Sequence, residues 1–321
     1  MTTLKASELP NLEFGGFFFG DLYHVPSHHT VEGDGASGAV LRRFLLSADA
    51  KFDARWSGRA RLEAYHEGAF ENYELTHRVL DFGITRVLGD HLLSAGLIPT
   101  ITYDVMEGFW GKRYLVRTAP DIQGLAARDV GVKLMGPVRP VDGLSYRLMY
   151  GSKETWEADK NPFDKTMGAI TWRGRAGWLV DAYLDWESRP GPYDRSTRQF
   201  LVGKKTDDYT LGIEYTNQDR DQDPDLELAT VMGVMRIDDR WSLMAQAHRL
   251  FKPSVKGNDI AYIPFDPTAK ATNLVAGLEY RFNEHLTLSP NIVWTHYSVN
   301  EAGEKPANDV HLRLTFYVNF D

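Results

Sequence analysis

Apolar and polar residues alternate along much of the chain. From Trp178 to Glu187 every second residue is apolar or aromatic, and from Asp181 onward the residues between them are Asp, Tyr or Glu. The same period of two recurs at 46–56, 274–282 and 310–320. Successive side chains of a strand point to opposite faces, so each segment is predicted to be a strand with one dry and one wet face. Few segments have a helical period, and the chain is predicted to be nearly all-β.

The connections between these strands alternate in length. Short turns are predicted near 57–58, 87–90, 137–142, 174–176, 205–207, 238–240 and 283–285. Long connections are predicted near 25–40, 101–127, 153–163, 218–225, 252–271 and 297–308. This alternation is typical of a transmembrane antiparallel up-and-down β-barrel in a bacterial outer membrane, here of about sixteen strands. We expect one barrel domain over 1–321, with residues 1–10 as an N-terminal periplasmic extension and both termini on the short-turn side.

A soluble β-sandwich or propeller also alternates, and two features favour lipid outside the sheet. The apolar faces carry many alanines, while the polar faces carry charges near mid-strand. Aromatic residues also stand at the ends of the dry faces, where the two interfaces of a membrane barrel have their aromatic girdles. We therefore expect five aromatic side chains to point outward at these interfaces: Trp178, Trp186, Tyr209, Trp241 and Trp294.

Composition narrows the classes of function. No apolar run reaches the about 18 residues that a membrane-spanning helix needs. The net charge of −8 argues against nucleic acid as a partner. The absence of cysteine excludes thiol catalysis, cysteine-ligated zinc and covalently attached haem, and we expect no cofactor. No signal peptide is visible at Met1, so we expect either the mature form of an outer-membrane protein or, if the barrel is wrong, a cytoplasmic protein.

The connection 101–127 is long and carries both aromatic and charged residues. An apolar connection of this size would not lie bare in water, so we expect it to fold into the lumen as the pore constriction. The alternative is that it packs over the mouth or into a subunit contact. The predicted constriction residues are Asp104, Glu107, Lys112, Arg113 and Arg117. Arg113 or Arg117 is predicted to face acidic wall residues across the narrowest point.

The same alternation assigns charged residues to the lumen wall. They are Arg43, Asp49, Lys51, Asp53, Arg61, Glu63, Lys133, Arg147, Asp181, Asp185, Glu214, Glu279, Arg281 and Arg313. An anion pore needs an excess of Arg and Lys along the lumen, whereas here the two signs roughly balance. We therefore expect weak charge selectivity.

Three short motifs resemble those of a known family. They are Leu92–Pro99 (LLSAGLIP), Val116–Pro120 (VRTAP) and Ala127–Gly136 (ARDVGVKLMG). Together they resemble the phosphate-selective porin O/P family, although the likeness is close only within 92–136. The resemblance implies sixteen strands, homotrimers in the outer membrane and a pore narrowed by an inward loop. The balanced lumen charges do not support phosphate selectivity.

Three other short segments could suggest a metal site or a catalytic motif, but each is better explained without one. The acidic run 219–225 is predicted to be a solvated loop, with weak divalent-ion binding as the alternative, because Pro224 stands where a calcium loop needs glycine. His24, His28 and His29 are interpreted as loop residues and not as a metal site. The segment Gly35–Gly38 is not the nucleophile elbow of a hydrolase.

These observations favour a non-enzymatic outer-membrane porin. It would let small hydrophilic solutes or ions diffuse passively, surrounded by outer-membrane lipid and lipopolysaccharide. The alternatives are a substrate-specific anion porin of the phosphate type and a barrel that sheathes a partner protein. A barrel enzyme acting on lipid would need an outward Ser/His set, and none is visible in the sequence.

Overall fold

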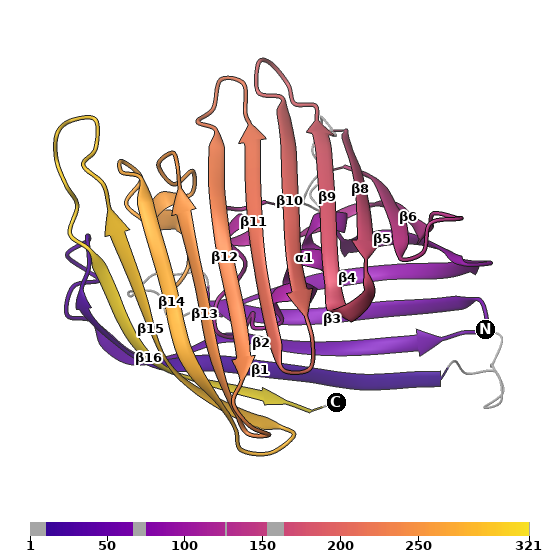
Figure 1. Cartoon of the computed structure of the whole chain (residues 1–321), viewed down its shortest axis with the longest axis horizontal. Coiled ribbons are helices and arrows are strands. Elements are labelled where there is room, and N and C mark those ends of the chain that lie inside the picture. Colours follow the sequence, from indigo (N-terminus) through magenta and orange to yellow (C-terminus); the bar gives the residue numbers. More distant parts are fainter. Residues whose placement is uncertain (1–10, 67–74, 126, 153–163, 321) are drawn as a thin grey trace.

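The fold is a closed barrel of sixteen antiparallel strands, as predicted (Figure 1). The computed structural model describes residues 11–66, 75–125, 127–152 and 164–320, so the predicted extension 1–10 lies outside the described residues. Each strand pairs with its sequence neighbours, and β1 (Asn11–Ser27) closes the barrel by pairing with β16 (Asp309–Asn319). No helix among the described residues is long and apolar enough to cross a membrane.

The other strands follow in chain order around the wall. They are β2 (Ser37–Lys51), β3 (Trp56–His66), β4 (Leu75–Leu88), β5 (His91–Pro99), β6 (Arg128–Pro137), β7 (Leu144–Gly151), β8 (Lys165–Arg173), β9 (Trp178–Glu187), β10 (Arg195–Lys205), β11 (Tyr209–Asp219), β12 (Leu226–Arg236), β13 (Trp241–Leu250), β14 (Ala271–Arg281) and β15 (Leu286–Tyr297). The helices are α1 (Ile101–Trp110), α2 (Ala119–Ile122) and the 3₁₀ turns η2 (Arg175–Gly177) and η3 (Gly257–Asp259).

The two ends of the barrel differ in their connections. At one end, which we call the turn side, tight turns join β2 to β3, β4 to β5 and the following pairs through β14 to β15. The start of β1 and the end of β16 lie at this same end, because Asn11 pairs with Lys51 and Asn319 pairs with Phe17. Longer connections occupy the other end, which we call the loop side. In Figure 1, β8 to β12 run steeply, β16 slants toward the C-terminus, and β1 to β4 run nearly horizontally behind the steep strands.

The barrel is apolar outside and polar inside. On β9, Leu184 and Trp186 are 65% and 54% exposed, whereas Asp181 and Asp185 are 2% and 4% exposed. A soluble sandwich would bury the leucine and expose the aspartates, so the observed polarity is that of a barrel with lipid outside and water inside. The five aromatic residues expected in the girdles are likewise all exposed: Trp178, Trp186, Tyr209, Trp241 and Trp294.

A β-bulge in β2 brings two consecutive arginines into the lumen. The register with β1 runs from Phe19↔Arg43 directly to Gly20↔Leu41, so Arg42 is an extra residue. Arg42 and Arg43 are both buried inside the barrel. Strict alternation would turn one of them toward lipid, where an arginine near the membrane centre costs about 2–4 kcal/mol. The bulge removes that cost.

A second bulge lies in β4. The register with β3 passes from Arg61↔Asp81 to Leu62↔Val79, which leaves Leu80 as the extra residue. Leu80 and Asp81 are both buried, whereas Val79 is exposed on the outside. Strict alternation fails at this point, and the bulge delivers Asp81 to the lumen.

A hydrophobic core fills part of the lumen. The connection 101–127, which we call the inward segment, enters the barrel together with the connection between β13 and β14. The core contains Phe109, Trp110, Leu115, Ile122 and Leu125 from the inward segment, Ile260, Ile263 and Phe265 from the β13–β14 connection, and Leu201, Leu228, Met232, Val275 and Val293 from the wall. Strands β10 to β15 are thus covered on the inside by packed chain.

Candidate functional site

The inward segment begins with a helix that the alternation of the sequence did not predict. Ile101, Val105 and Phe109 recur every four residues and are buried on one face of α1, which is the spacing of an amphipathic helix. Gly111 ends the helix with a left-handed φ of 67°, and its N–H donates to the carbonyl of Glu107 at 2.7 Å. The chain then turns back, and the indole N–H of Trp110 donates to the carbonyl of Val116 at 2.9 Å.

Two glycines of the wall allow α1 to approach closely. Gly203 on β10 and Gly212 on β11 are paired across the strands, and a Cβ at either position would overlap the ring of Phe109. Lys205 lies beside them and donates from Nζ to the carbonyls of Gly108 at 2.8 Å and Phe109 at 3.1 Å. A lysine is favourable there because it meets the negative end of the helix dipole. We call Gly203 and Gly212 the glycine platform.

Replacing a platform glycine should loosen the inward segment. We expect Gly212→Leu to lower the melting temperature by several degrees, because the leucine side chain and the Phe109 ring would share one space, and overpacking costs about 1–3 kcal/mol. Thermal unfolding of the folded barrel, followed by circular dichroism, measures the shift. Gly233→Leu on β12 is the matched control, because a Cβ there meets only ordinary contacts. Equal melting temperatures for the two variants would show that the platform does not hold α1.

Wall residues anchor the inward segment through its backbone. Lys133 donates to the carbonyl of Pro99 at 3.0 Å and pairs with Asp104 at 2.8 Å. Arg147 donates to the carbonyl of Ile101 at 2.8 Å, and Arg313 donates to that of Leu115 at 3.1 Å. Arg42 donates to the carbonyls of Tyr114 and Leu115. The predicted wall cations Lys133, Arg147 and Arg313, together with Arg42, therefore hold the segment in place.

Lys112, one of the predicted constriction residues, makes an ion pair between the segment and an acidic wall residue. Lys112 pairs with Glu279 of β14 at 2.6 Å, and Tyr114 donates its hydroxyl proton to the same carboxylate. Arg113 instead pairs within the segment, with Glu107 at 2.8 Å and with Asp121. Among the described residues, no ion pair joins Arg117 to the wall. Arg113 and Arg117 line the same cavity as Glu63 of β3, so the expectation that one of them faces an acidic wall residue stays a prediction. The ion pairs of Arg113 itself lie within the folded-back segment.

Four arginines of the lumen interact with Tyr103 of α1 or with its neighbours. The guanidinium carbons of Arg128 and Arg113 lie 4.2 Å and 5.2 Å from the centre of its ring. Arg128 and Arg61 both pair with Asp81, and Arg43 pairs with Glu63. We call Arg43, Arg61, Arg113 and Arg128 the arginine layer. Two cavities adjoin this layer. Arg43 and Arg113 line one of them, and Asp81, the ion-pair partner of Arg61 and Arg128, lines the other.

The cavity on the loop side is strongly basic. Its volume is about 540 Å³. Its charged lining residues are the cations Arg42, Arg43, Arg78, Arg113, Arg117, Lys256 and Arg313 and the acids Glu63 and Asp259. Asp21, Glu107 and Asp121 lie behind this lining and pair with Arg42 and Arg113. Arg117 and Lys256 form no ion pair among the described residues, and they leave the cavity a positive excess that the sequence tally did not reveal.

The cavity on the turn side is nearly balanced. It has a volume of about 430 Å³. Its charged lining residues are the acids Glu13, Asp49, Asp81 and Asp104 and the cations Lys51, Arg59 and Lys133. A solute that crossed the barrel along this route, from the turn-side cavity to the loop-side cavity, would pass the arginine layer and move from a balanced lining to a basic one.

The connection between β13 and β14 crosses to the opposite wall above the loop-side cavity. The hydroxyl oxygen of Tyr262 lies 2.6 Å from the backbone carbonyl oxygen of Arg42 and 2.7 Å from that of His66. Its single proton is shared between these two acceptors. Burial raises the pKa of Tyr262 to about 12, so the hydroxyl keeps that proton at neutral pH. Tyr262 and Lys256 both line the cavity, and the connection therefore narrows its entrance.

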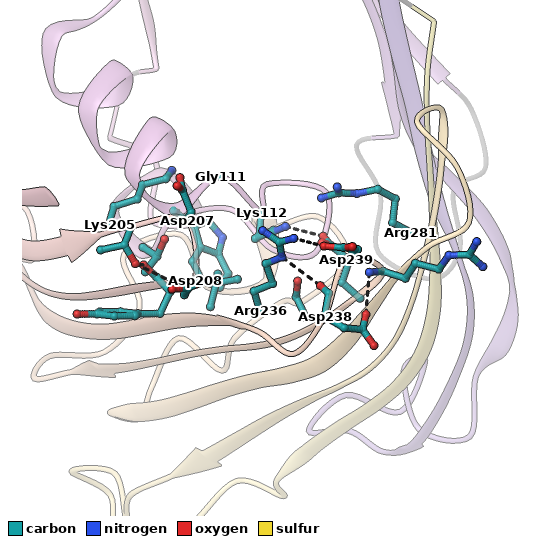
Figure 2. Close-up of a pocket in the computed structure, with 17 residues that line it drawn as sticks. Gly111, Lys112, Lys205, Asp207, Asp208, Arg236, Asp238, Asp239 and Arg281 are labelled. Carbon is teal, nitrogen blue, oxygen red and sulfur yellow. Dashed lines mark hydrogen bonds and ion pairs between the residues drawn. The ribbon is translucent and has the colours of Figure 1, made fainter. Parts of the chain in front are cut away.

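A further turn-side cavity of about 530 Å³ lies under the end of α1 (Figure 2). Figure 2 shows Lys205, Asp207 and Asp208 at one end of it and Arg236, Asp238, Asp239 and Arg281 toward the other. Arg281, a predicted wall residue, lies here and not beside the arginine layer. The Lys112–Glu279 pair also lines this cavity.

Six other predicted wall residues line none of these three cavities, and two of them, Arg61 in the arginine layer and Arg147 beside Ile101, are described above. Asp53 lies in the β2–β3 turn, where its carboxylate accepts the backbone N–H groups of Arg55 and Trp56, so strand alternation does not apply to it. Asp181 pairs with Arg147. Asp185 pairs with Lys165 at 3.1 Å and accepts the hydroxyl proton of Tyr183 at 2.5 Å. Glu214 accepts from the hydroxyl of Thr216 at 2.7 Å and from the side-chain amide of Gln199 at 3.2 Å.

Sequence reasoning missed several residues of the route. Arg42 and Asp81 enter the lumen through the bulges, and the Arg42-Arg43 doublet was the visible signal for the first one. Arg128 stands in one of the three motifs but was given no role. Tyr103 lies in the segment predicted to be a constriction, yet only the charged residues of that segment were singled out.

No protein-family model matches the sequence, and no curated protein matches it, so the resemblance to the phosphate-selective porin O/P family gains no support. Solved structures do match in fold. An anion-selective porin from Comamonas acidovorans is 11% identical with a TM-score of 0.65, over 97% of this chain and 100% of that one. The outer membrane channel DcaP of Acinetobacter baumannii is 12% identical with a TM-score of 0.65, over 100% of both chains. In-vitro folded OmpT, an outer membrane protein of Vibrio cholerae in its trimer form, is 15% identical with a TM-score of 0.63, over 96% of this chain and 99% of that one.

Proposed function

We propose that the protein is a porin of the bacterial outer membrane through which small hydrophilic solutes diffuse passively, with a mild preference for small anions. The observation that carries this proposal is the pair of cavities on either side of the arginine layer, inside a barrel whose outer surface is apolar. An apolar exterior with a charged interior suits a barrel that spans lipid. The loop side would then face the outside of the cell, and the turn side would face the periplasm.

The sign of the preference follows from charges that stay unbalanced. The loop-side cavity has seven basic and two acidic lining groups, whereas the turn-side cavity has three basic and four acidic groups. Fixed cations in a narrow lumen attract anions and repel cations. The preference should be mild, because Arg43, Arg61, Arg113 and Arg128 are each paired with a carboxylate and salt screens the remaining charge over about 8–10 Å.

The solute class is set by the same features. Aqueous cavities of these volumes suit small polar molecules and inorganic or carboxylate anions, and no further residue singles out phosphate. The packed core on the inside of β10 to β15 leaves no lumen wide enough for a partner protein, so we do not propose a sheath. We propose transport without catalysis, and assembly as a homotrimer by analogy with the trimer form of OmpT.

Electrical recording tests the proposal directly. Purified protein added to a planar lipid bilayer should produce stepwise increases in ion conductance. In a potassium chloride gradient, the reversal potential should have the sign of chloride preference, and the preference should shrink as salt concentration rises. Folded barrel that inserts without conductance would contradict the porin. A reversal potential on the potassium side would contradict the anion preference alone.

A further inference from the structure

Two histidines and an aspartate converge at the loop side, where the first strand meets the last. His28 and His29 directly follow β1, and Asp309 is the first residue of β16. One ligand atom from each residue lies within 4.8 Å of the other two. His29 Nδ1 is 2.9 Å and His28 Nε2 is 3.9 Å from the same carboxylate oxygen of Asp309, and the three side chains are at most 3% exposed.

Neighbouring groups hold both imidazoles by their other nitrogen. His29 Nε2 lies 3.0 Å from the side-chain oxygen of Asn258, which can accept the proton on Nε2 and leave the Nδ1 lone pair toward Asp309. His28 Nδ1 lies 3.0 Å from the hydroxyl oxygen of Thr30 and equally far from the Thr30 backbone nitrogen. The Thr30 N–H donates to Nδ1 in this structure, which places the ring proton on Nε2. Binding an ion through Nε2 would move that proton to Nδ1, where the Thr30 hydroxyl can accept it at the expense of the Thr30 N–H bond.

The carboxylate is held in place as well. Asp309 accepts the backbone N–H of His29 at 2.7 Å and the hydroxyl proton of Tyr297. An orienting partner on each ligand is the usual second shell of a protein metal site. By contrast, His24, which the sequence grouped with His28 and His29, is exposed on the outside of β1 and takes no part in the cluster.

We propose that His28, His29 and Asp309 bind one divalent transition-metal ion, of which Zn²⁺ is the representative. Two imidazoles and one carboxylate suit zinc and its neighbours, whereas magnesium and calcium prefer oxygen ligands alone. Three protein ligands at about 2.0–2.2 Å, with water as the fourth, make a tetrahedral site whose ligands stand about 3.3 Å apart. The observed 2.9 Å and 3.9 Å bracket that separation, so small rotations of the two rings would complete the site.

The ion would fasten the loop side of the barrel and would lie outside the route of solutes. His29 and Asp309 are 280 residues apart, and Asn258 ties the β13–β14 connection to the same cluster. Any ligand that binds only the folded chain stabilises it. Binding should therefore raise the melting temperature of the barrel and leave its conductance unchanged.

Calorimetric titration of metal-stripped, folded protein with zinc chloride tests this proposal. We expect one ion per chain with micromolar or tighter affinity, a rise of several degrees in melting temperature, and no comparable effect of magnesium. Cobalt bound in the same place should give the visible absorption of a tetrahedral site. His29→Gln and Asp309→Asn should each weaken zinc binding at least tenfold, whereas His24→Gln, which removes an exposed histidine, should leave binding unchanged.

A third variant guards against a failure to fold. His28→Gln removes one proposed ligand but leaves the hydrogen bonds between His29 and Asp309 in place. Unchanged zinc affinity in folded His28→Gln would overturn the site, and so would a wild-type protein that binds no zinc. Binding that all variants retain would assign the ion to other surface groups and would overturn the proposal equally. None of these outcomes bears on conductance, so the porin is tested separately.

Discussion

Deleting residues 106–116 should raise single-channel conductance by roughly twofold or more and flatten ion selectivity, because a pore's narrowest section dominates its resistance. The deletion removes Arg113 from the arginine layer and Phe109 from the glycine platform. It also removes Lys112, whose pair with Glu279 ties the segment to β14. Sixteen paired strands remain, so the barrel should still close, with a lower melting temperature because wall residues of the core lose their cover.

A deletion in another connection is the control for this experiment. Residues 301–305, between β15 and β16, are all exposed and line none of the cavities described above. Their removal should leave conductance and selectivity unchanged in planar bilayers. Should the folded 106–116 deletion conduct no better than this control, the inward segment would not be the constriction.

Reversing two charges in the loop-side cavity should abolish the anion preference. Arg117 and Lys256 line that cavity, and neither forms an ion pair within the described part of the chain. The double variant Arg117→Glu with Lys256→Glu therefore breaks no salt bridge, while each substitution replaces a positive by a negative charge. Nine charged lining groups would then be five basic and four acidic. Together with the acidic excess on the turn side, this should move the reversal potential from the chloride side toward the potassium side.

The control carries the same change in net charge elsewhere. Arg175 in the turn between β8 and β9 and Lys305 in the β15–β16 connection are both exposed and line neither main cavity. Arg175→Glu with Lys305→Glu should leave the reversal potential where it is. A similar shift in both double variants would mean that overall charge, and not the cavity, sets the preference.

The barrel was predictable because its evidence repeats in every strand. One face of β9 alternates from Trp178 to Trp186 without a break, and an error in one strand does not disturb the others. Alternation fails only where a bulge adds a residue, as at Arg42 and Leu80. The Arg42-Arg43 doublet could have indicated the first bulge, because no arginine is favoured in lipid. The second bulge leaves no comparable mark, since leucine is acceptable on either face.

The interior was harder to predict because it depends on contacts between distant segments. The sequence indicated that 101–127 is apolar and must be covered, but not that it forms α1 or which wall it meets. The alternation of strand residues assigned Lys133, Arg147 and Arg313 to the pore wall as free charges. In the structure each of them donates to a backbone carbonyl of the inward segment or of Pro99 just before it. Lys133 and Arg147 also pair with Asp104 and Asp181, so their charges are neutralised away from the loop-side cavity. The basic excess of the loop-side cavity could therefore not be read from a tally of signs.

The hydrophobic core inside the lumen determines how little the current through the open pore should fluctuate. Trp110 and Leu115 are sealed against wall residues such as Met232, and lifting them would expose a large apolar surface to water. Excursions of this kind are rare, because segments that open easily are those with few buried apolar contacts. The inward segment is thus a fixed part of the wall and not a gate. Solute flux through such a pore is governed by its static shape and charge, with little flicker between open and closed states.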